Sequence, residues 1–261
     1  LTFWSPNINI FRDPRWGRGM ETYGEDPYLT GTLAVEFVKG LQGDDPKYLK
    51  LVATPKHFAV HSGPEPERHH FDAVVGDRDL WDTYLPGFEM AVRLGGAYSV
   101  MCAYNRFRGD ACCGSKFLLT EILRGRWGLR GYVDSDCGAI RNSWRDHKVV
   151  ETSPEAVALA VKSGTDLNCG SQYDSLGKAV ELGLITEAEI DTALRRLFRA
   201  RFKLGMFDPP ESVRYAQIPF EVNNRPEHAE LALQVARESI VLLKNDGLLP
   251  LRADYRSVAL V

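Results

Sequence analysis

The chain alternates short apolar runs with longer segments that carry helix signals. The apolar runs that we interpret as strands are 1–10, interrupted at Pro6, and 51–54, 97–102, 131–139 and 165–168. The segments that we interpret as helices are 26–42, 79–94, 115–126, 153–164, 171–182, 186–204 and 226–243. Strands and helices therefore alternate from residue 1 to about residue 204, a pattern typical of βα units around a parallel sheet.

Several predicted helices have recognisable first residues. Asp26 precedes a proline and suits the cap of the 26–42 helix, and Ser153 is expected to cap the helix after it. Thr186 and Glu189 have the spacing of a capping box. The apolar residues of the 26–42 helix recur at helical spacing: Leu29, Leu33, Phe37 and Leu41.

Two α/β layouts fit this alternation. Five strand candidates are too few for a complete eight-stranded barrel, unless earlier strands precede Leu1 or a short one has been missed. A doubly wound sheet is the competing layout. No Gly-rich phosphate loop follows any predicted strand, which weakens the nucleotide-binding version of that alternative.

Composition narrows the class of partner. The chain has 261 residues, 44% of them hydrophobic and 26% charged, with a formal net charge of −3. Near-neutral charge argues against nucleic acid or an anionic membrane surface as the main partner. No apolar run approaches the roughly 18 residues of a membrane span. We therefore expect one larger globular domain, or one domain with a piece of another, and neither nucleic acid nor a membrane as partner.

Cysteine and histidine patterns give no metal site. Five cysteines are present, and an odd number does not form a closed set of disulfides. None of their spacings matches a zinc site. His61, His69 and His70 form the alternative metal cluster, but no carboxylate-rich or His-x-His pattern accompanies them. We predict neither a metal nor a cofactor.

The most informative stretch is 131–139, an apolar run that ends in Asp134, Ser135, Asp136 and Cys137. A buried parallel strand whose carboxyl end carries chemistry has this pattern. In α/β folds the catalytic groups lie at such strand ends. We predict that Asp136 is a nucleophile. The alternative is that Asp136 only caps the helix that follows.

Polar side chains also follow other predicted strands. They are Arg18, Lys56 with His57, and Tyr104. In parallel strands all of these ends meet at one mouth, beside Asp136. Nearby cations keep a nucleophilic carboxylate ionised, and several directional donors suit a sugar ring. In the alternative interpretation the cations are solvated surface charges and Tyr104 is a core residue.

Four motifs together resemble the N-terminal barrel of family 3 glycoside hydrolases. They are Asp13-Pro14-Arg15-Trp16-Gly17-Arg18, Lys56-His57-Phe58, Met101-Cys102-Ala103-Tyr104-Asn105 and Gly131-Tyr132-Val133-Asp134-Ser135-Asp136-Cys137-Gly138. The stretch 239–251 resembles the passage into the α/β sandwich domain of that family. The resemblance covers essentially the whole chain.

This resemblance implies a (β/α)8 barrel and a retaining, exo-acting β-glycosidase. Asp136 matches the nucleophile of the family. The residues expected to hold the terminal sugar or to shape the surroundings of the nucleophile are Arg18, Lys56, His57, Tyr104 and Arg68. A Schiff-base enzyme that uses Lys56 and a non-catalytic sugar-binding protein are the alternatives from other classes.

The resemblance also predicts the organisation of the chain. Residues 1–204 are expected to form the barrel without its early strands, 205–225 a linker, and 226–261 a connector helix and the start of the sandwich domain. That domain, the expected partner, supplies the acid/base carboxylate beyond Val261, so the chain alone is expected to be incomplete and inactive. The loop at 61–72 lacks the Asp-His pattern that β-N-acetylhexosaminidases use instead.

Within the family the chain resembles the β-xylosidase branch. Cys137 follows the nucleophile, where the glucosidase branch usually has an aromatic residue, and the 166–170 stretch also resembles xylosidases. A β-D-xylosidase is therefore favoured, with β-glucosidase and α-L-arabinofuranosidase as alternatives. We expect Cys137 and Cys169 to lie at neighbouring strand ends and to form a disulfide, with two free buried thiols as the alternative.

Overall fold

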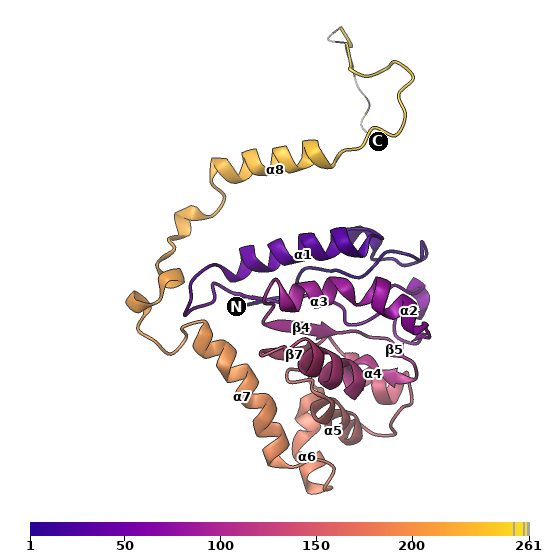
Figure 1. Ribbon diagram of the computed structural model, residues 1–261, viewed down its shortest axis with the longest axis vertical. Coiled ribbons are helices and arrows are strands. Elements are labelled where there is room, and N and C mark those ends of the chain that lie inside the picture. The colour runs from indigo at the N-terminus through magenta and orange to yellow at the C-terminus, as the bar shows by residue number, and fades with distance from the viewer. Residues whose placement is uncertain (253, 258, 260–261) are drawn as a thin grey trace. The chain divides into compact units, whose positions relative to one another are not determined.

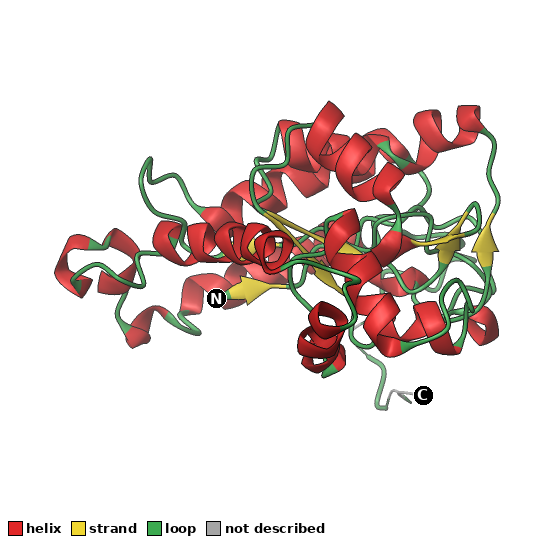
Figure 2. Cartoon of the chain, turned by 90° about the horizontal axis from the view of Figure 1, so that it is seen from below, coloured by secondary structure: helices red, strands yellow, loops and turns green. Residues whose placement is uncertain are grey.

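The computed structural model describes residues 1–252, 254–257 and 259. The chain forms two units, Leu1–Ala216 and Gln217–Val261. The first unit contains the sheet, and Figure 2 shows its strands lying between helices. In the described part of the chain no helix is both long and apolar enough to cross a membrane.

Parallel pairs build the sheet of the first unit. β1 (Thr2–Phe3) pairs with β2 (Val52–Ala53), and β4 (Ser99–Cys102) pairs with β7 (Tyr132–Ser135). Figure 1 shows β4 and β7 side by side. Single parallel bridges complete the order: Asn7 with Lys56, Phe58 with Cys102, and Asp134 with Leu167.

Each of these extended segments therefore lies next to the following one along the chain. The strand order of a doubly wound sheet reverses at a switch point, and no reversal occurs among these segments. The layout is that of a barrel. All five predicted strands are shorter than expected. The difference is greatest for 1–10, which forms β1 and one bridge, and for 165–168, which forms one bridge at Leu167.

The helices of the first unit occupy most of the predicted segments. They are α1 (Pro27–Gln42), α2 (Asp77–Asp79), α3 (Pro86–Arg93), α4 (Ala139–Arg145), α5 (Ser153–Ser163), α6 (Leu176–Glu181) and α7 (Glu187–Lys203), with π-helical turns at Leu80–Tyr84 and Phe117–Arg126. In Figure 1, α1 and α3 lie side by side, and the two helices are in contact.

The caps come from short polar side chains. Asp26 Oδ1 accepts the Leu29 N–H at 2.6 Å, and Thr186 forms a complete capping box with Glu189. Helix α5 begins differently from the prediction. Its cap is Thr152, in a capping box with Glu155, and the predicted cap, Ser153, is the first helical residue.

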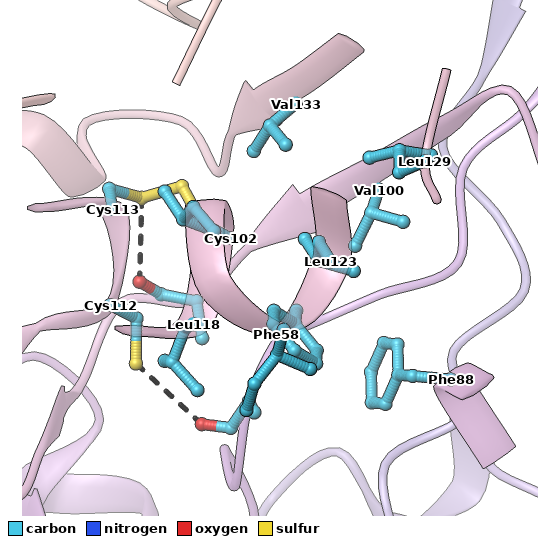
Figure 3. Packing of buried hydrophobic residues seen from close by; sticks show 14 of the residues in the cluster. Phe58, Phe88, Val100, Cys102, Cys112, Cys113, Leu118, Leu123, Leu129 and Val133 are labelled. Atoms are coloured by element: carbon cyan, nitrogen blue, oxygen red, sulfur yellow. Dashed lines mark hydrogen bonds between the residues drawn. A yellow bond between two sulfur atoms is a disulfide. The ribbon is translucent and has the colours of Figure 1, made fainter. Parts of the chain in front are cut away.

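The core lies between the strands and the helices that cover them. Phe58 is fully buried, with its ring 5.0 Å from that of Phe88 and 5.7 Å from that of Trp127 (Figure 3). Replacing a buried Phe by Ala typically costs about 3–5 kcal/mol. Because Phe58 follows His57 directly, this packing also fixes the backbone of the candidate site.

Helix α1 does not bury Leu29 and Leu33, two of the apolar residues that predicted it. Thr30, Ala34 and Val38 are fully buried, whereas Leu29 and Leu33 are 50% and 42% exposed. Small side chains allow α1 to approach α3 closely, since a Cβ added to Gly31 would lie 2.4 Å from the sulfur of Met90. Spacing alone predicted the helix but not this choice of face.

A second, small sheet lies in the loops beyond the strand ends. β3 (Asp72–Ala73) pairs in parallel with β5 (Arg106–Phe107), which pairs antiparallel with β6 (Asp110–Ala111). The sequence pattern predicted no strand at any of these three positions. This sheet joins the loop after His57 to the loop after β4.

The second unit contains α8 (Pro226–Ser239) and the predicted turn after it. Asn245 Oδ1 accepts the N–H groups of Gly247 at 3.2 Å and Leu249 at 3.0 Å. The division into barrel, linker and start of a further domain stays a prediction. Residues 253, 258, 260 and 261, in the predicted start of the sandwich domain, lie outside the described residues.

Candidate active site

Asp136 lies directly after β7, at the carboxyl end of the sheet. Its N–H donates to the carbonyl of Cys102 at 3.2 Å, and its Oδ1 accepts the N–H of Cys137 at 2.8 Å. Gly138, in the left-handed region at φ 83°, is the residue that begins α4. The carboxylate therefore does not serve as the helix cap, and its Oδ2 stays available for chemistry.

Two nitrogen groups from distant parts of the chain face this carboxylate. His57 Nε2 lies 3.3 Å from Asp136 Oδ2, and Arg18 Nη1 lies 3.9 Å from the same oxygen. His57 is completely buried, and only 9% of Asp136 is exposed. The strand ends thus bring together three of the residues singled out in the sequence.

Lys56 is half-buried between Arg18 and the carboxylates. Burial lowers the pKa of its ammonium group and the Arg18 cation adds to that effect, while Glu21, Asp136 and Asp134 oppose it. Among the described residues its Nζ has no hydrogen-bond partner. The lysine is a partly desolvated donor at the site and not a solvated surface charge.

Tyr104 follows β4 and neighbours Asp136. Its hydroxyl donates to the carbonyl of Cys137 at 3.1 Å, and the ring packs against His69 with centroids 4.4 Å apart. Burial and the neighbouring Asp136 carboxylate raise the pKa of the phenol. Tyr104 is therefore a neutral hydroxyl around pH 7.

Two opposing effects set the ionisation of Asp136. Burial raises the pKa of the carboxyl, and the Cys137 N–H, the Tyr104 hydroxyl and the Arg18 and Lys56 cations oppose that shift without cancelling it. A carboxylate in this position is short of solvation and is consequently a better nucleophile than one in water.

Arg68 pairs with a carboxylate of its own loop. Its guanidinium pairs with Glu65 Oε1, and Glu65 Oε2 also accepts the N–H of Gly17 at 3.1 Å. In the described part of the chain no hydrogen bond or ion pair joins Arg68 to Asp136. Arg68 instead ties the loop after His57 to the loop that carries Arg18.

Sequence reasoning missed two residues that hold the site together. Glu21 accepts two hydrogen bonds from Arg18, at 2.6 and 2.8 Å, and these bonds and burial set the pKa of Glu21 at about 2. Asn9 Oδ1 accepts both the backbone N–H of His57 at 2.9 Å and its Nδ1 at 3.0 Å. The only signal in the sequence was the nearness of these side chains to the Arg18 loop.

Two disulfides flank the residue at the centre of the site. One joins Cys137 to Cys169, the expected pair, and the other joins Cys102 to Cys113, which the sequence did not predict. Cys112 is a free buried thiol. Because Cys102 and Cys137 both hydrogen-bond to Asp136 through their backbones, each bridge restrains one side of the carboxylate.

The histidines of the alternative metal cluster have other partners. His61 Nδ1 lies 3.0 Å from Asn105 Oδ1, and His69 Nδ1 lies 2.9 Å from Asn142 Nδ2. Burial lowers the pKa of His61 to about 3. Within the part of the chain that the structure describes, no group of three or more His, Cys, Asp and Glu side chains is placed to hold a metal ion.

A hollow lies at the other end of the sheet. It has a volume of about 470 Å³ and is lined at the amino ends of β4 and β7 by residues that include Tyr98, Trp127 and Arg130. No carboxylate lines it. The gathering of reactive groups, and not the size of a hollow, identifies the region around Asp136 as the candidate active site.

Residues 2–200 match the Glycosyl hydrolase family 3 N terminal domain. The chain is 47% identical to a xylan 1,4-beta-xylosidase of Xylanibacter ruminicola, covering 100% of this chain and 31% of the relative. A solved GH3 exo-beta-xylosidase, in complex with a xylobiose aziridine probe, superposes with a TM-score of 0.92 at 37% identity, covering 98% of this chain and 34% of that one. A beta-glucosidase from Listeria innocua superposes with a TM-score of 0.86 at 31% identity, covering 95% and 35%. The chain thus spans about a third of the length of the proteins that it matches.

Proposed function

The chain belongs to glycosyl hydrolase family 3, and we propose that it provides the nucleophile of a retaining, exo-acting β-glycosidase. The observation that carries the proposal is the surroundings of Asp136. A buried carboxylate at a strand end, 3.3 Å from His57 Nε2 and 3.9 Å from Arg18 Nη1, fits a nucleophile with donors for a sugar ring around it. The TIM-like barrel common to the solved structures fits a site at this end of the strands.

In the proposed first step, Asp136 Oδ2 attacks the anomeric carbon of the terminal sugar. The bond from that carbon to the leaving-group oxygen breaks, and a second carboxylic acid protonates this oxygen. The sugar is then held as an ester of Asp136. Water, deprotonated by the second carboxylate, attacks the same carbon and releases the sugar with its original configuration.

The second carboxyl group must lie about 5–5.5 Å from the first in a retaining enzyme. We assign it to the sandwich domain expected beyond Val261. The same domain is the partner that completes the pocket. The chain alone is therefore expected to bind sugar weakly and to lack turnover.

The surrounding side chains take different parts in this reaction. Arg18 and Lys56 favour the ionised form of Asp136 and donate hydrogen bonds to sugar hydroxyls. Tyr104 stays neutral and restrains the turn after the nucleophile through the Cys137 carbonyl. Arg68 supports the loop above the pocket through Glu65.

We propose xylose as the terminal sugar. The xylosidase names of the relatives support this choice. Cys137 also supports it, because it is held in a disulfide at the position where an aromatic residue of the glucosidase branch would cover a bulkier sugar. The β-glucosidase that superposes on this chain supports glucose as the second candidate. Comparing kcat/KM for aryl β-xylosides, β-glucosides and α-L-arabinofuranosides on the full-length protein decides among them.

Asp136→Ala in the full-length protein tests the nucleophile. We expect hydrolysis of an aryl β-xyloside to fall by at least about a thousandfold, and added azide to restore turnover and give the α-glycosyl azide. The matched control is Asp134→Asn, two residues earlier on β7, where burial raises the pKa of the carboxyl and the amide has nearly the same shape. Near-normal turnover by Asp136→Ala, or a β-configured azide product, contradicts the assignment.

A further inference from the structure

The amide of Asn9 is fixed in one orientation. Its Nδ2 donates to the carbonyl of His57 at 2.8 Å, so its Oδ1 must face the opposite way, toward the backbone N–H of His57 at 2.9 Å. The same oxygen lies 3.0 Å from His57 Nδ1. A flipped amide would place its NH2 group against an N–H donor and its oxygen against a carbonyl, so no alternative orientation is tolerable.

This orientation decides which nitrogen of the imidazole carries the proton. An amide oxygen only accepts, so His57 Nδ1 must donate and therefore carries a hydrogen. In the neutral ring the other nitrogen, Nε2, then presents a lone pair. That lone pair faces Asp136 Oδ2 across 3.3 Å, and Nε2 is buried without a hydrogen-bond partner among the described residues.

We propose that Asn9 is a positioning residue that holds His57 in its Nδ1–H form, so that Nε2 acts as a hydrogen-bond acceptor beside Asp136. The role in turnover rests on the proposed glycosidase function, whereas the proton position does not. An acceptor at Nε2 gives the Asp136 carboxylate no stabilising hydrogen bond. The carboxylate keeps its nucleophilicity, and Nε2 is left to accept a hydrogen bond from a sugar hydroxyl.

The charges around His57 favour the neutral ring. Burial is the largest influence that lowers the pKa of the imidazole, and the groups facing it from neighbouring segments add to that effect. These groups are His61, Arg18, Lys56 and Arg68, and the Asp136 carboxylate is in contact with the ring. A second proton on the ring would have to enter a site that already holds three cations.

Asn9 is itself held in place by the next polar side chain along the strand. Asn7 Oδ1 accepts the N–H of Asn9 at 3.2 Å, and Asn7 Nδ2 donates to Glu21 Oε2 at 3.1 Å. Because Glu21 also binds Arg18, one hydrogen-bonded chain joins the Arg18 guanidinium to the His57 ring. Glu21 and Asn7 thus hold Asn9 in place, and through Asn9 they hold the His57 ring.

The proton position can be measured without any turnover. Solid-state NMR of the full-length protein, labelled with 15N and 13C in histidine, separates Nδ1 from Nε2 by their bonds to different ring carbons. The His57→Gln variant identifies the signals of this ring by their loss. We expect a protonated Nδ1 and an unprotonated Nε2 at pH 7. A hydrogen on Nε2, alone or with Nδ1, overturns the proposal even if the enzyme proves inactive.

The pH dependence of kcat/KM tests the functional part. In Asn9→Asp a carboxylate at Nδ1 stabilises the imidazolium, so protonation of His57 removes the acceptor at Nε2 at a higher pH. The acidic limb should then follow the titration of His57 and move up by about one pH unit or more. In Asn9→Leu the imidazole proton is free to move to Nε2, and the Nε2–H group then donates a hydrogen bond to Asp136. This bond lowers the pKa of that carboxyl. The acidic limb of kcat/KM should therefore move to lower pH, and the maximum value of kcat/KM should be reduced. Shifts of the acidic limb in opposite directions in these two variants support the proposal.

A purely structural role predicts a different result. Loss of packing lowers kcat/KM at every pH and moves neither limb. In the His57→Gln background neither Asn9 variant should shift the limb, because the group that transmits the effect is gone. Asn142→Asp, the same change at the Asn142–His69 pair, is the matched control and should leave the limb in place. If the wild type is active and the acidic limb of kcat/KM lies at the same pH in the wild type and in both Asn9 variants, the functional part is refuted. The glycosidase assignment is then left intact.

Discussion

Glu21→Gln tests whether the site depends on a side chain that does not face the substrate. Glu21 holds Arg18 through two hydrogen bonds, at 2.6 and 2.8 Å, and only 15% of the Arg18 side chain is exposed. The neutral amide keeps the shape but offers one acceptor oxygen, and its NH2 group faces a guanidinium donor. Arg18 should then lose its orientation toward Asp136, whose Oδ2 lies 3.9 Å from Nη1.

The size of the effect follows from the pKa of Glu21. Hydrogen bonds from Arg18, opposed by burial, lower it from 4.5 to about 2. At about 1.36 kcal/mol per pKa unit, this difference corresponds to roughly 3.4 kcal/mol. Because 36% of the Glu21 side chain is exposed, solvent screening reduces the expected value to about 1–2 kcal/mol.

The sign of the pH dependence is fixed by the direction of this shift. A carboxyl with a depressed pKa stabilises the fold fully above its unfolded value, near 4.5, and the stabilisation disappears as pH falls toward about 2. Urea denaturation of the full-length protein should show Glu21→Gln less stable by about 1–2 kcal/mol at pH 7, with a smaller difference at pH 3. We expect kcat/KM to fall about tenfold through the misplaced Arg18.

Glu36→Gln is the control for this experiment. Its partner Lys39 lies 3.0 Å away, and both side chains are more than half exposed. An exposed pair of this kind contributes about 0–1 kcal/mol. Our reasoning is refuted if Glu21→Gln destabilises no more than Glu36→Gln at pH 7, or if its effect is the same at pH 3.

Three further predictions concern the rest of the molecule. Lys56→Ala should lower kcat/KM on aryl β-xylosides by about tenfold or more, because a charged hydrogen bond contributes about 1.5–3 kcal/mol, and a loss below threefold contradicts its place in the site. Asp166→Asn should destabilise the fold by about 3 kcal/mol with little change in kcat, because Asp166 is buried and pairs with Arg124 at 2.5 Å and Arg196 at 2.8 Å. A loss of kcat that corresponds to the same free energy as the loss of stability refutes a purely structural role. Alkylation of the unfolded chain without reductant should label Cys112 alone, and mass spectrometry that finds other labelled cysteines contradicts the two disulfides.

Local patterns identified most of the elements and the centre of the site. The buried run that ends at Asp136 became β7 with the carboxylate directly after it, and the polar ends of the other strands brought His57 and Arg18 to the same place. Parallel strands aligned in one direction make this convergence unavoidable, so a list of strand ends predicts it. Arg68 followed no strand, and the structure pairs it with Glu65 instead.

The sequence by itself determined the alternation of strands and helices, the capping signals, and which strand ends carry reactive side chains. These features depend on neighbours a few positions away, and a linear pattern records them. Only the tertiary structure decided that α1 buries Ala34 and not Leu33, that Cys102 pairs with Cys113, and that Asn9 holds the ring of His57. Asn9 and His57 are 48 positions apart, and no local spacing encodes such a contact. Their partnership arises because two parallel strands place them side by side, and the direction of one amide then fixes where the proton lies.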